Sequence, residues 1–160
     1  MDYLRLQIDL GRDVDYSMLE TDVLASTLKQ YLQGLPEPIL TNRLYPRFIT
    51  VSKISDIELQ LTYLSSLVNT LPHSHLDLLR YLVGFLQKVV EHEEQNKMTM
   101  QNLSIVFGPI LMQTNSDDPK IMMEHANLVT SITGLLLNNS NKIFSVCYFL
   151  LILCGCTDSL

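Results

Sequence analysis

The sequence from Gln95 to Leu111, QNKMTMQNLSIVFGPIL, combines two asparagines with a helix start and an apolar run. Thr99 belongs to the residue types that cap helix N-termini, so we expect a helix to begin directly after it. The pair Gly108-Pro109 is expected to bend or end that helix. Asn96 and Asn102 are separated by less than two helical turns, so both side chains can be aimed at one surface.

A second block, LKQYLQGLPEPIL, runs from residue 28 to residue 40. Apolar residues at near-helical spacing predict a helix over residues 22–33, with Asp22 as its cap and Gly34 at its end. The prolines that follow exclude a helix there, because each one favours an extended conformation in the residue before it. Pro38 is expected to open the next short helix, where its missing N–H costs nothing.

Three further stretches carry apolar residues at helical spacing, namely 56–70, 72–93 and 118–137. No persuasive alternating pattern indicates a strand, and the connecting segments are short. The sequence therefore predicts an all-α fold. A length of 160 residues suits one domain, and 47% apolar with 18% charged residues is typical of a globular chain.

The formal charge of −6 argues against nucleic acid or an anionic membrane surface as partner, since both select basic patches. No glycine-rich phosphate loop is present, so we expect no bound nucleotide and no cofactor. His73 and His75 have a spacing that could ligate a metal, but no cysteine or carboxylate cluster accompanies them, and no metal is expected. The three cysteines lie near the C-terminus without a disulfide or zinc pattern, which favours a reducing, intracellular compartment.

The two blocks resemble the signatures of the Rho GTPase-activating (RhoGAP) domain family, in the right order and over roughly residues 4–144. The resemblance implies a RhoGAP-like helical bundle over residues 1–144. In the family an arginine finger lies in a Gly-hydrophobic-Phe-Arg motif, which this chain does not contain. The segment from Leu4 to Asp15 is similar to the family's segment just after that loop. We therefore expect the finger before Met1, so that the domain lacks its N-terminal helices.

The resemblance also implies a function. The chain would have no active site of its own and would bind the GTP-bound form of a Rho, Rac or Cdc42-like small GTPase, with impaired stimulation of GTP hydrolysis. Lys29 would contact the GTPase or support the finger loop, Asn96 would position that loop or touch the switch region, and Asn102 would bond at the GTPase-facing surface. Gln33 stands where the family usually has arginine, so it loses a fixed charge.

Two other interpretations stay open. One is a catalytically silent scaffold that only binds a GTPase or another protein. The other is a gene-model fragment that does not fold stably.

Residues 145–160 form an apolar extension outside the domain, and their apolar run is too short to span a bilayer, which needs about 20 residues. We expect no transmembrane segment and a cytoplasmic protein that is recruited to membranes, if at all, through its GTPase partner.

Overall fold

The computed structural model describes residues 2–113 and 118–144, and all regular secondary structure in these two ranges is helical. The helices are α1 (Asp2–Asp9), the short 3-10 helix η1 (Tyr16–Met18), α2 (Thr21–Gln33), α3 (Tyr45–Ser52), α4 (Ile57–Val68), α5 (His73–Glu91), α6 (Glu93–Asn96), α7 (Met100–Leu111) and α8 (Pro119–Asn138). The all-α prediction is thus confirmed. The predicted extension over residues 145–160 lies outside the described residues.

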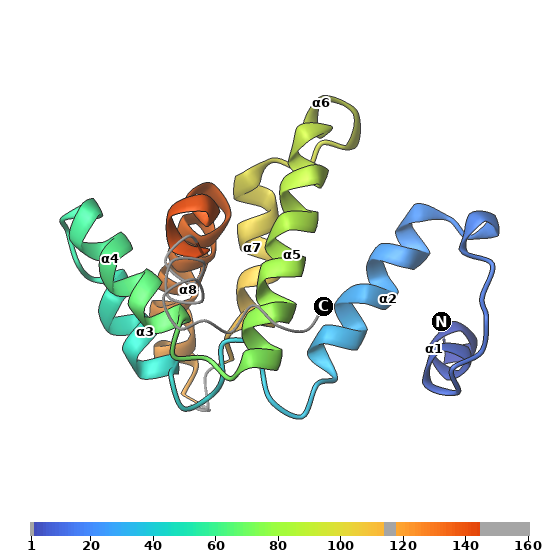
Figure 1. The fold of residues 1–160 in the computed structure, drawn as a ribbon, viewed down its shortest axis with the longest axis horizontal. Coiled ribbons are helices and arrows are strands. Elements are labelled where there is room, and N and C mark those ends of the chain that lie inside the picture. The colour runs from blue at the N-terminus through green and yellow to red at the C-terminus, as the bar shows by residue number, and fades with distance from the viewer. Residues whose placement is uncertain (1, 114–117, 145–160) are drawn as a thin grey trace, which may run out of the picture.

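The helices are arranged in a central group with a wing on either side (Figure 1). Helices α5, α7 and α8 stand at the centre, and α3 and α4 pack on one side of them. Helix α2 extends on the other side, with α1 beyond it. Helix α7 packs most extensively on α8, and α2 contacts both α7 and α1.

Side-chain caps begin helices where the sequence places them, as α4 and α7 show. A carboxylate oxygen of Asp56 accepts a hydrogen bond from the backbone N–H of Leu59 (2.9 Å) at the start of α4. The hydroxyl of Thr99 accepts one from the backbone N–H of Asn102 (3.2 Å) at the start of α7. These starts were predictable because a cap and its helix are close in sequence.

Two local predictions were wrong, and one of the two alternatives in a third is excluded. Asp22 lies in the first turn of α2, and Glu20 takes the cap position without a side-chain bond. Pro38 opens a buried turn closed by the N–H of Thr41, while Pro46 is the proline that opens a helix, α3. The Gly108-Pro109 pair does not end α7, which continues to Leu111. The helix continues although Pro109 has no N–H to donate, because Ile110 and Leu111 beyond it are buried and the N–H of Met112 still donates to the carbonyl of Gly108 at 3.0 Å.

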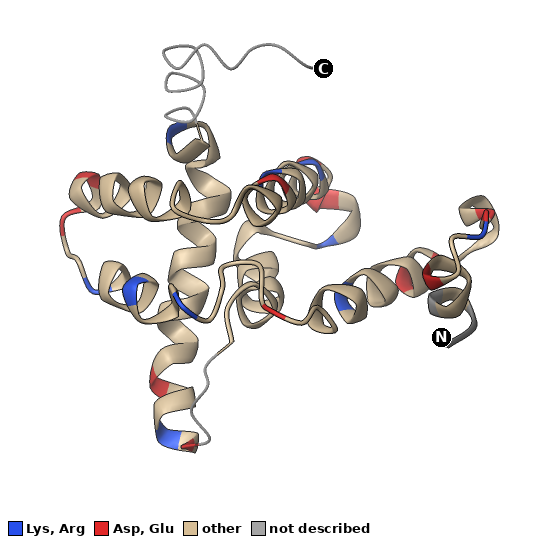
Figure 2. Ribbon diagram, turned by 60° about the horizontal axis from the view of Figure 1, so that its bottom comes forward, with Lys and Arg blue, Asp and Glu red and all other residues tan. Residues whose placement is uncertain are grey.

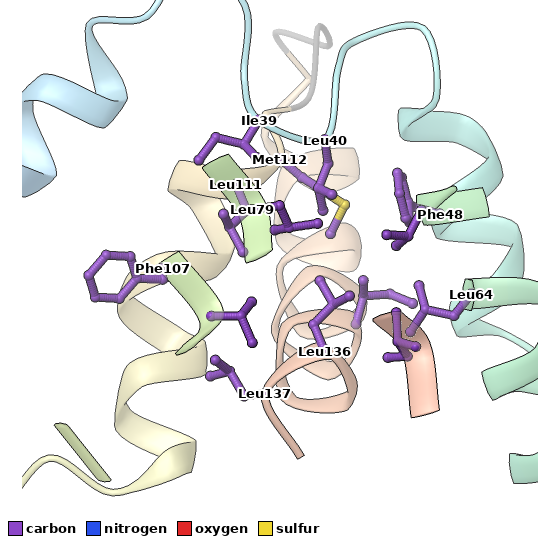
Figure 3. Close-up of a cluster of buried hydrophobic side chains, with 14 of the residues drawn as sticks. Ile39, Leu40, Phe48, Leu64, Leu79, Phe107, Leu111, Met112, Leu136 and Leu137 are labelled. Atoms are coloured by element: carbon purple, nitrogen blue, oxygen red, sulfur yellow. The ribbon is translucent and has the colours of Figure 1, made fainter. Parts of the chain in front are cut away.

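The core includes a loop as well as helices. Ile39 and Leu40, in the connection between α2 and α3, are 1% and 0% exposed and lie among the core side chains of α5 and α7 (Figure 3). The backbone N–H of Leu40 donates to the carbonyl of Leu111 at 3.0 Å. Nδ1 of His75 donates to the carbonyl of Ile39 at 2.9 Å, since a carbonyl can only accept. The loop thereby attaches α2 to the end of α7 and the start of α5.

Helices α7 and α8 approach each other closely at Gly108. A Cβ atom built on Gly108 would lie 3.1 Å from Cγ1 of Val129 and 3.4 Å from Oγ1 of Thr133, both on α8. A side chain at this position would therefore require the side chain of Val129 or the helices themselves to shift. Gly84, within α5, is different, because a Cβ atom there would have no neighbour within 4 Å.

These two glycines give a matched test of the packing. Gly108→Val should lower the free energy of unfolding by about 1–3 kcal/mol, the usual cost of overpacking a buried contact. Gly84→Val should leave the stability unchanged or raise it slightly, because valine is a better helix former than glycine. Urea denaturation of the two variants measures the difference. Equal stability of the two would contradict the close approach of α7 and α8.

Candidate functional site

Asn96 is bonded on both sides of its amide group to the segment that joins α5 to α7. Its Nδ2 donates to the backbone carbonyl of Val89 at 2.7 Å. Its Oδ1 accepts from the backbone N–H of Met98 at 2.7 Å. The backbone groups fix which atom is which, because a carbonyl only accepts and an N–H only donates. Asn96 therefore holds the end of α5 to the residues that lead into α7.

Lys97 follows in a left-handed backbone conformation, with φ 59° and ψ 15°. A helix often ends in this conformation, but glycine or asparagine usually supplies it. The ammonium group of Lys97 donates to the carbonyl of Glu94 at 2.6 Å. Its own carbonyl accepts from Nδ2 of Asn102 at 3.0 Å. Asn96, Lys97 and Asn102 thus belong to one hydrogen-bonded unit, which we call the Asn96–Asn102 turn (residues 96–102).

Asn102 begins an exposed stripe along α7. Ile105, Val106 and Pro109 follow it at i+3, i+4 and i+7, and all of them are exposed. The exposed fractions of Ile105 and Val106 are 53% and 37%. These two apolar residues were missed in the sequence, where they looked like part of a continuous buried run. The signal was present, since counting helical positions from Asn102 places them on its face.

Lys29 and Gln33 lie one turn apart on α2 and so share one face of that helix. Lys29 is half-buried and Gln33 is exposed. Lys29 is the only basic residue of α2, whose first turn contains the acidic residue Asp22. Figure 2 shows the basic segment of α2 (blue) apart from the acidic segments (red) at the start of the helix. Within residues 2–113 and 118–144, no hydrogen bond or ion pair engages either side chain or links them to the Asn96–Asn102 turn. Lys29 and Gln33 are connected to the Asn96–Asn102 turn through the packing contact between α2 and α7.

The N-terminal arginines, Arg5 and Arg12, lie in a segment rich in carboxylates. Arg5 is within α1, and Arg12 donates to Oε1 of Gln7 at 3.2 Å. Hydrogen bonds from the hydroxyl (2.6 Å) and the backbone N–H (3.0 Å) of Ser17 lower the pKa of Asp15. That carboxylate is therefore negative at neutral pH, three residues from Arg12.

The described residues contain no group of three or more histidine, cysteine or acidic side chains placed to hold a metal ion. His75, which the sequence offers as half of a metal pair, has its Nδ1 bonded to the core loop. None of the helices in residues 2–113 and 118–144 is both long and apolar enough to cross a membrane.

Comparison with known proteins adds to this geometry. A family described as RhoGAP domain matches residues 1–116 of the chain. N-chimaerin of Mus musculus is 36% identical over 133 residues, which are 82% of this chain and 29% of that protein. The GTPase-activating protein pac-1 of Caenorhabditis elegans is 37% identical over 120 residues, 74% of this chain and 8% of that protein. The chain thus spans less than a third of either relative.

A solved structure extends the similarity to three dimensions. The crystal structure of human Rho GTPase activating protein 15 (ARHGAP15) superposes with a TM-score of 0.82 at 29% sequence identity. The alignment covers 89% of this chain and 69% of that one. The family match over residues 1–116 includes both α2 and the Asn96–Asn102 turn.

Proposed function

The chain belongs to the RhoGAP domain family, and on that premise we propose that it binds the GTP-bound form of a Rho-family small GTPase through α2 and α7. Lys29, Gln33 and Asn102 are the proposed contact residues, and Asn96 supports them. The observation that carries this proposal is the exposed stripe of α7, which begins at Asn102 and continues through Ile105 and Val106. A polar group beside exposed apolar side chains is typical of a protein interface.

Acceleration of GTP hydrolysis has two requirements. The attacking water and the switch region around it must be ordered, and the charge that develops on the transferring phosphoryl group must be stabilised. A lysine and fixed side-chain amides serve the first requirement by holding the switch loops. Lys29 and Asn102 are suited to that role, because one carries an ammonium group without a partner in the described ranges and the other has an amide with a fixed orientation.

The second requirement is met in this class of reaction by an arginine supplied in trans, which is worth about 10³ to 10⁵ in rate. We propose that residues 1–160 by themselves supply it poorly. Arg5 lies within α1, and the guanidinium group of Arg12 is bonded to Gln7, with Asp13 and Asp15 close to it in sequence. A negative Asp15 nearby would also repel a phosphate.

A second candidate function is a scaffold that binds a GTPase without accelerating hydrolysis. The same placement of Arg5 and Arg12 favours it. The two candidates share the binding surface and differ only in the rate of hydrolysis, so a rate measurement separates them. Neither candidate requires an active site within the chain itself.

The binding surface predicts opposite effects from two changes on α2. Lys29→Ala should weaken binding to a Rho-type GTPase loaded with a non-hydrolysable GTP analogue by about tenfold, because a hydrogen bond to a charged group is worth about 1.5–3 kcal/mol. Gln33→Arg should strengthen binding several-fold by restoring a fixed charge with two parallel donors. Titration calorimetry measures both.

Lys53→Ala is the matched control. Lys53 is an exposed lysine that caps α3, on the opposite side of the central helices from α2 (Figure 1). Its removal changes the net charge as Lys29→Ala does, and it should leave the affinity unchanged. If both lysine variants weaken binding equally, the effect is one of overall charge and α2 is not the binding surface.

The rate prediction concerns the arginines. The chain of 160 residues should bind a GTP-loaded Rho-family GTPase but raise its hydrolysis rate less than tenfold, because the phosphoryl charge lacks its main partner. Phosphate release under single-turnover conditions measures this. The proposal is wrong on this point if the chain stimulates hydrolysis a hundredfold or more and Arg5→Ala or Arg12→Ala abolishes the effect.

A further inference from the structure

Lys97 adopts a backbone conformation that is unfavourable for a lysine. Its φ of 59° is left-handed, which brings Cβ close to the following carbonyl oxygen in every residue except glycine. Such a conformation persists when the surrounding structure enforces it, and it occurs preferentially at functional sites. Asn96 supplies that enforcement, because its two hydrogen bonds tie Val89 on one side and Met98 on the other side of Lys97.

The left-handed turn determines where the Lys97 carbonyl points. That carbonyl accepts the hydrogen bond from Nδ2 of Asn102 at 3.0 Å. The backbone N–H of Asn102 is held separately by the hydroxyl of Thr99. Asn102 is thus fixed through both its backbone and its side chain, although it is exposed. An exposed asparagine without such bonds would sample several rotamers and lose more entropy on binding.

We infer that Asn96 and Lys97 are positioning residues that hold the amide of Asn102 in its binding orientation. This inference rests on the proposed function, since Asn102 is a proposed contact with the GTPase. Asn96 is not itself a contact in this account, because its amide nitrogen and oxygen are both engaged with backbone groups. The role of Lys97 lies in its backbone, and its ammonium group is bonded back to the carbonyl of Glu94.

Two substitutions of Lys97 separate the backbone from the charge. Lys97→Gly and Lys97→Val both remove the ammonium group and its bond to Glu94. They differ in that glycine adopts a φ of 59° freely, whereas a β-branched residue strongly disfavours it. Lys97→Gly should bind the analogue-loaded GTPase within twofold of the unmodified chain, and Lys97→Val should bind about fivefold to tenfold more weakly.

Asn96 provides an independent pair of variants. Asn96→Ala removes the two hydrogen bonds that the Asn96 side chain makes, to Val89 and to Met98, and should weaken binding as Lys97→Val does. Asn96→Asp keeps the acceptor for the N–H of Met98 but sets a carboxylate oxygen against the carbonyl of Val89, where two acceptors repel each other, so its affinity should be no higher than that of Asn96→Ala. Thermal unfolding of each variant confirms that the remainder of the fold is intact, because these residues are exposed and lie outside the core.

A measurement on the free chain tests the positioning directly. Hydrogen exchange of the Asn102 side-chain amide, followed by NMR, should be slow in the unmodified chain and in Lys97→Gly. It should be fast in Lys97→Val and Asn96→Ala, which lose the acceptor geometry at the Lys97 carbonyl. This measurement needs no GTPase. If Lys97 only stabilised the fold, the exchange rate of the Asn102 side-chain amide would not differ between Lys97→Gly and Lys97→Val.

The outcomes are distinct. Equal loss of affinity in Lys97→Gly and Lys97→Val would overturn the inference, because the ammonium group would then be the contact. Unchanged affinity in both would also overturn it, since the turn would not affect binding. If the unmodified chain binds no Rho-family GTPase, the proposed function fails, and the amide exchange alone decides whether the turn holds Asn102.

Discussion

The arrangement of this molecule depends on a buried loop between α2 and α3. Helix α2 buries few of its own side chains, since only Thr27 and Leu32 are buried, so its direction is not set by a large interface. It is set by Ile39 and Leu40, whose side chains enter the core and whose backbone groups bond to His75 and Leu111. The same loop therefore fixes α2 relative to the end of α7, the helix whose other end carries Asn102.

The sequence was a good guide wherever the determining contact is local. The start of α7 was predicted to the residue because Thr99 bonds to the N–H three positions later, and the amphipathic pattern located α4, α5 and α8. The sequence was a poor guide where contacts with distant residues determine the local conformation. Pro38 lies in a buried turn because the loop enters the core, and α7 continues past Pro109 because Ile110 and Leu111 are covered by other helices.

In the candidate site, too, the features set by local sequence were predictable and those set by the surrounding structure were not. The spacing of Asn96 and Asn102 predicted that both side chains could be aimed at one surface. The structure places them in one turn, but the amide of Asn96 is bonded to the backbone on two sides. The left-handed conformation of Lys97, which makes this possible, has no signal in a lysine. Ile105 and Val106 were missed because an apolar run gives no indication of which members are exposed until the helical face of Asn102 is known. On the proposed account, this fixed face provides binding, while the rate depends on an arginine that it does not supply.

The central claim is that α2 and the first half of α7 form one binding surface. Hydrogen–deuterium exchange with mass spectrometry, with and without a Rho-family GTPase loaded with a non-hydrolysable GTP analogue, tests it most directly. The account predicts slower exchange on binding in residues 22–33 and 95–106, with no change in residues 57–68 of α4. Protection confined to α3 and α4, or protection of residues 95–106 without α2, would contradict it.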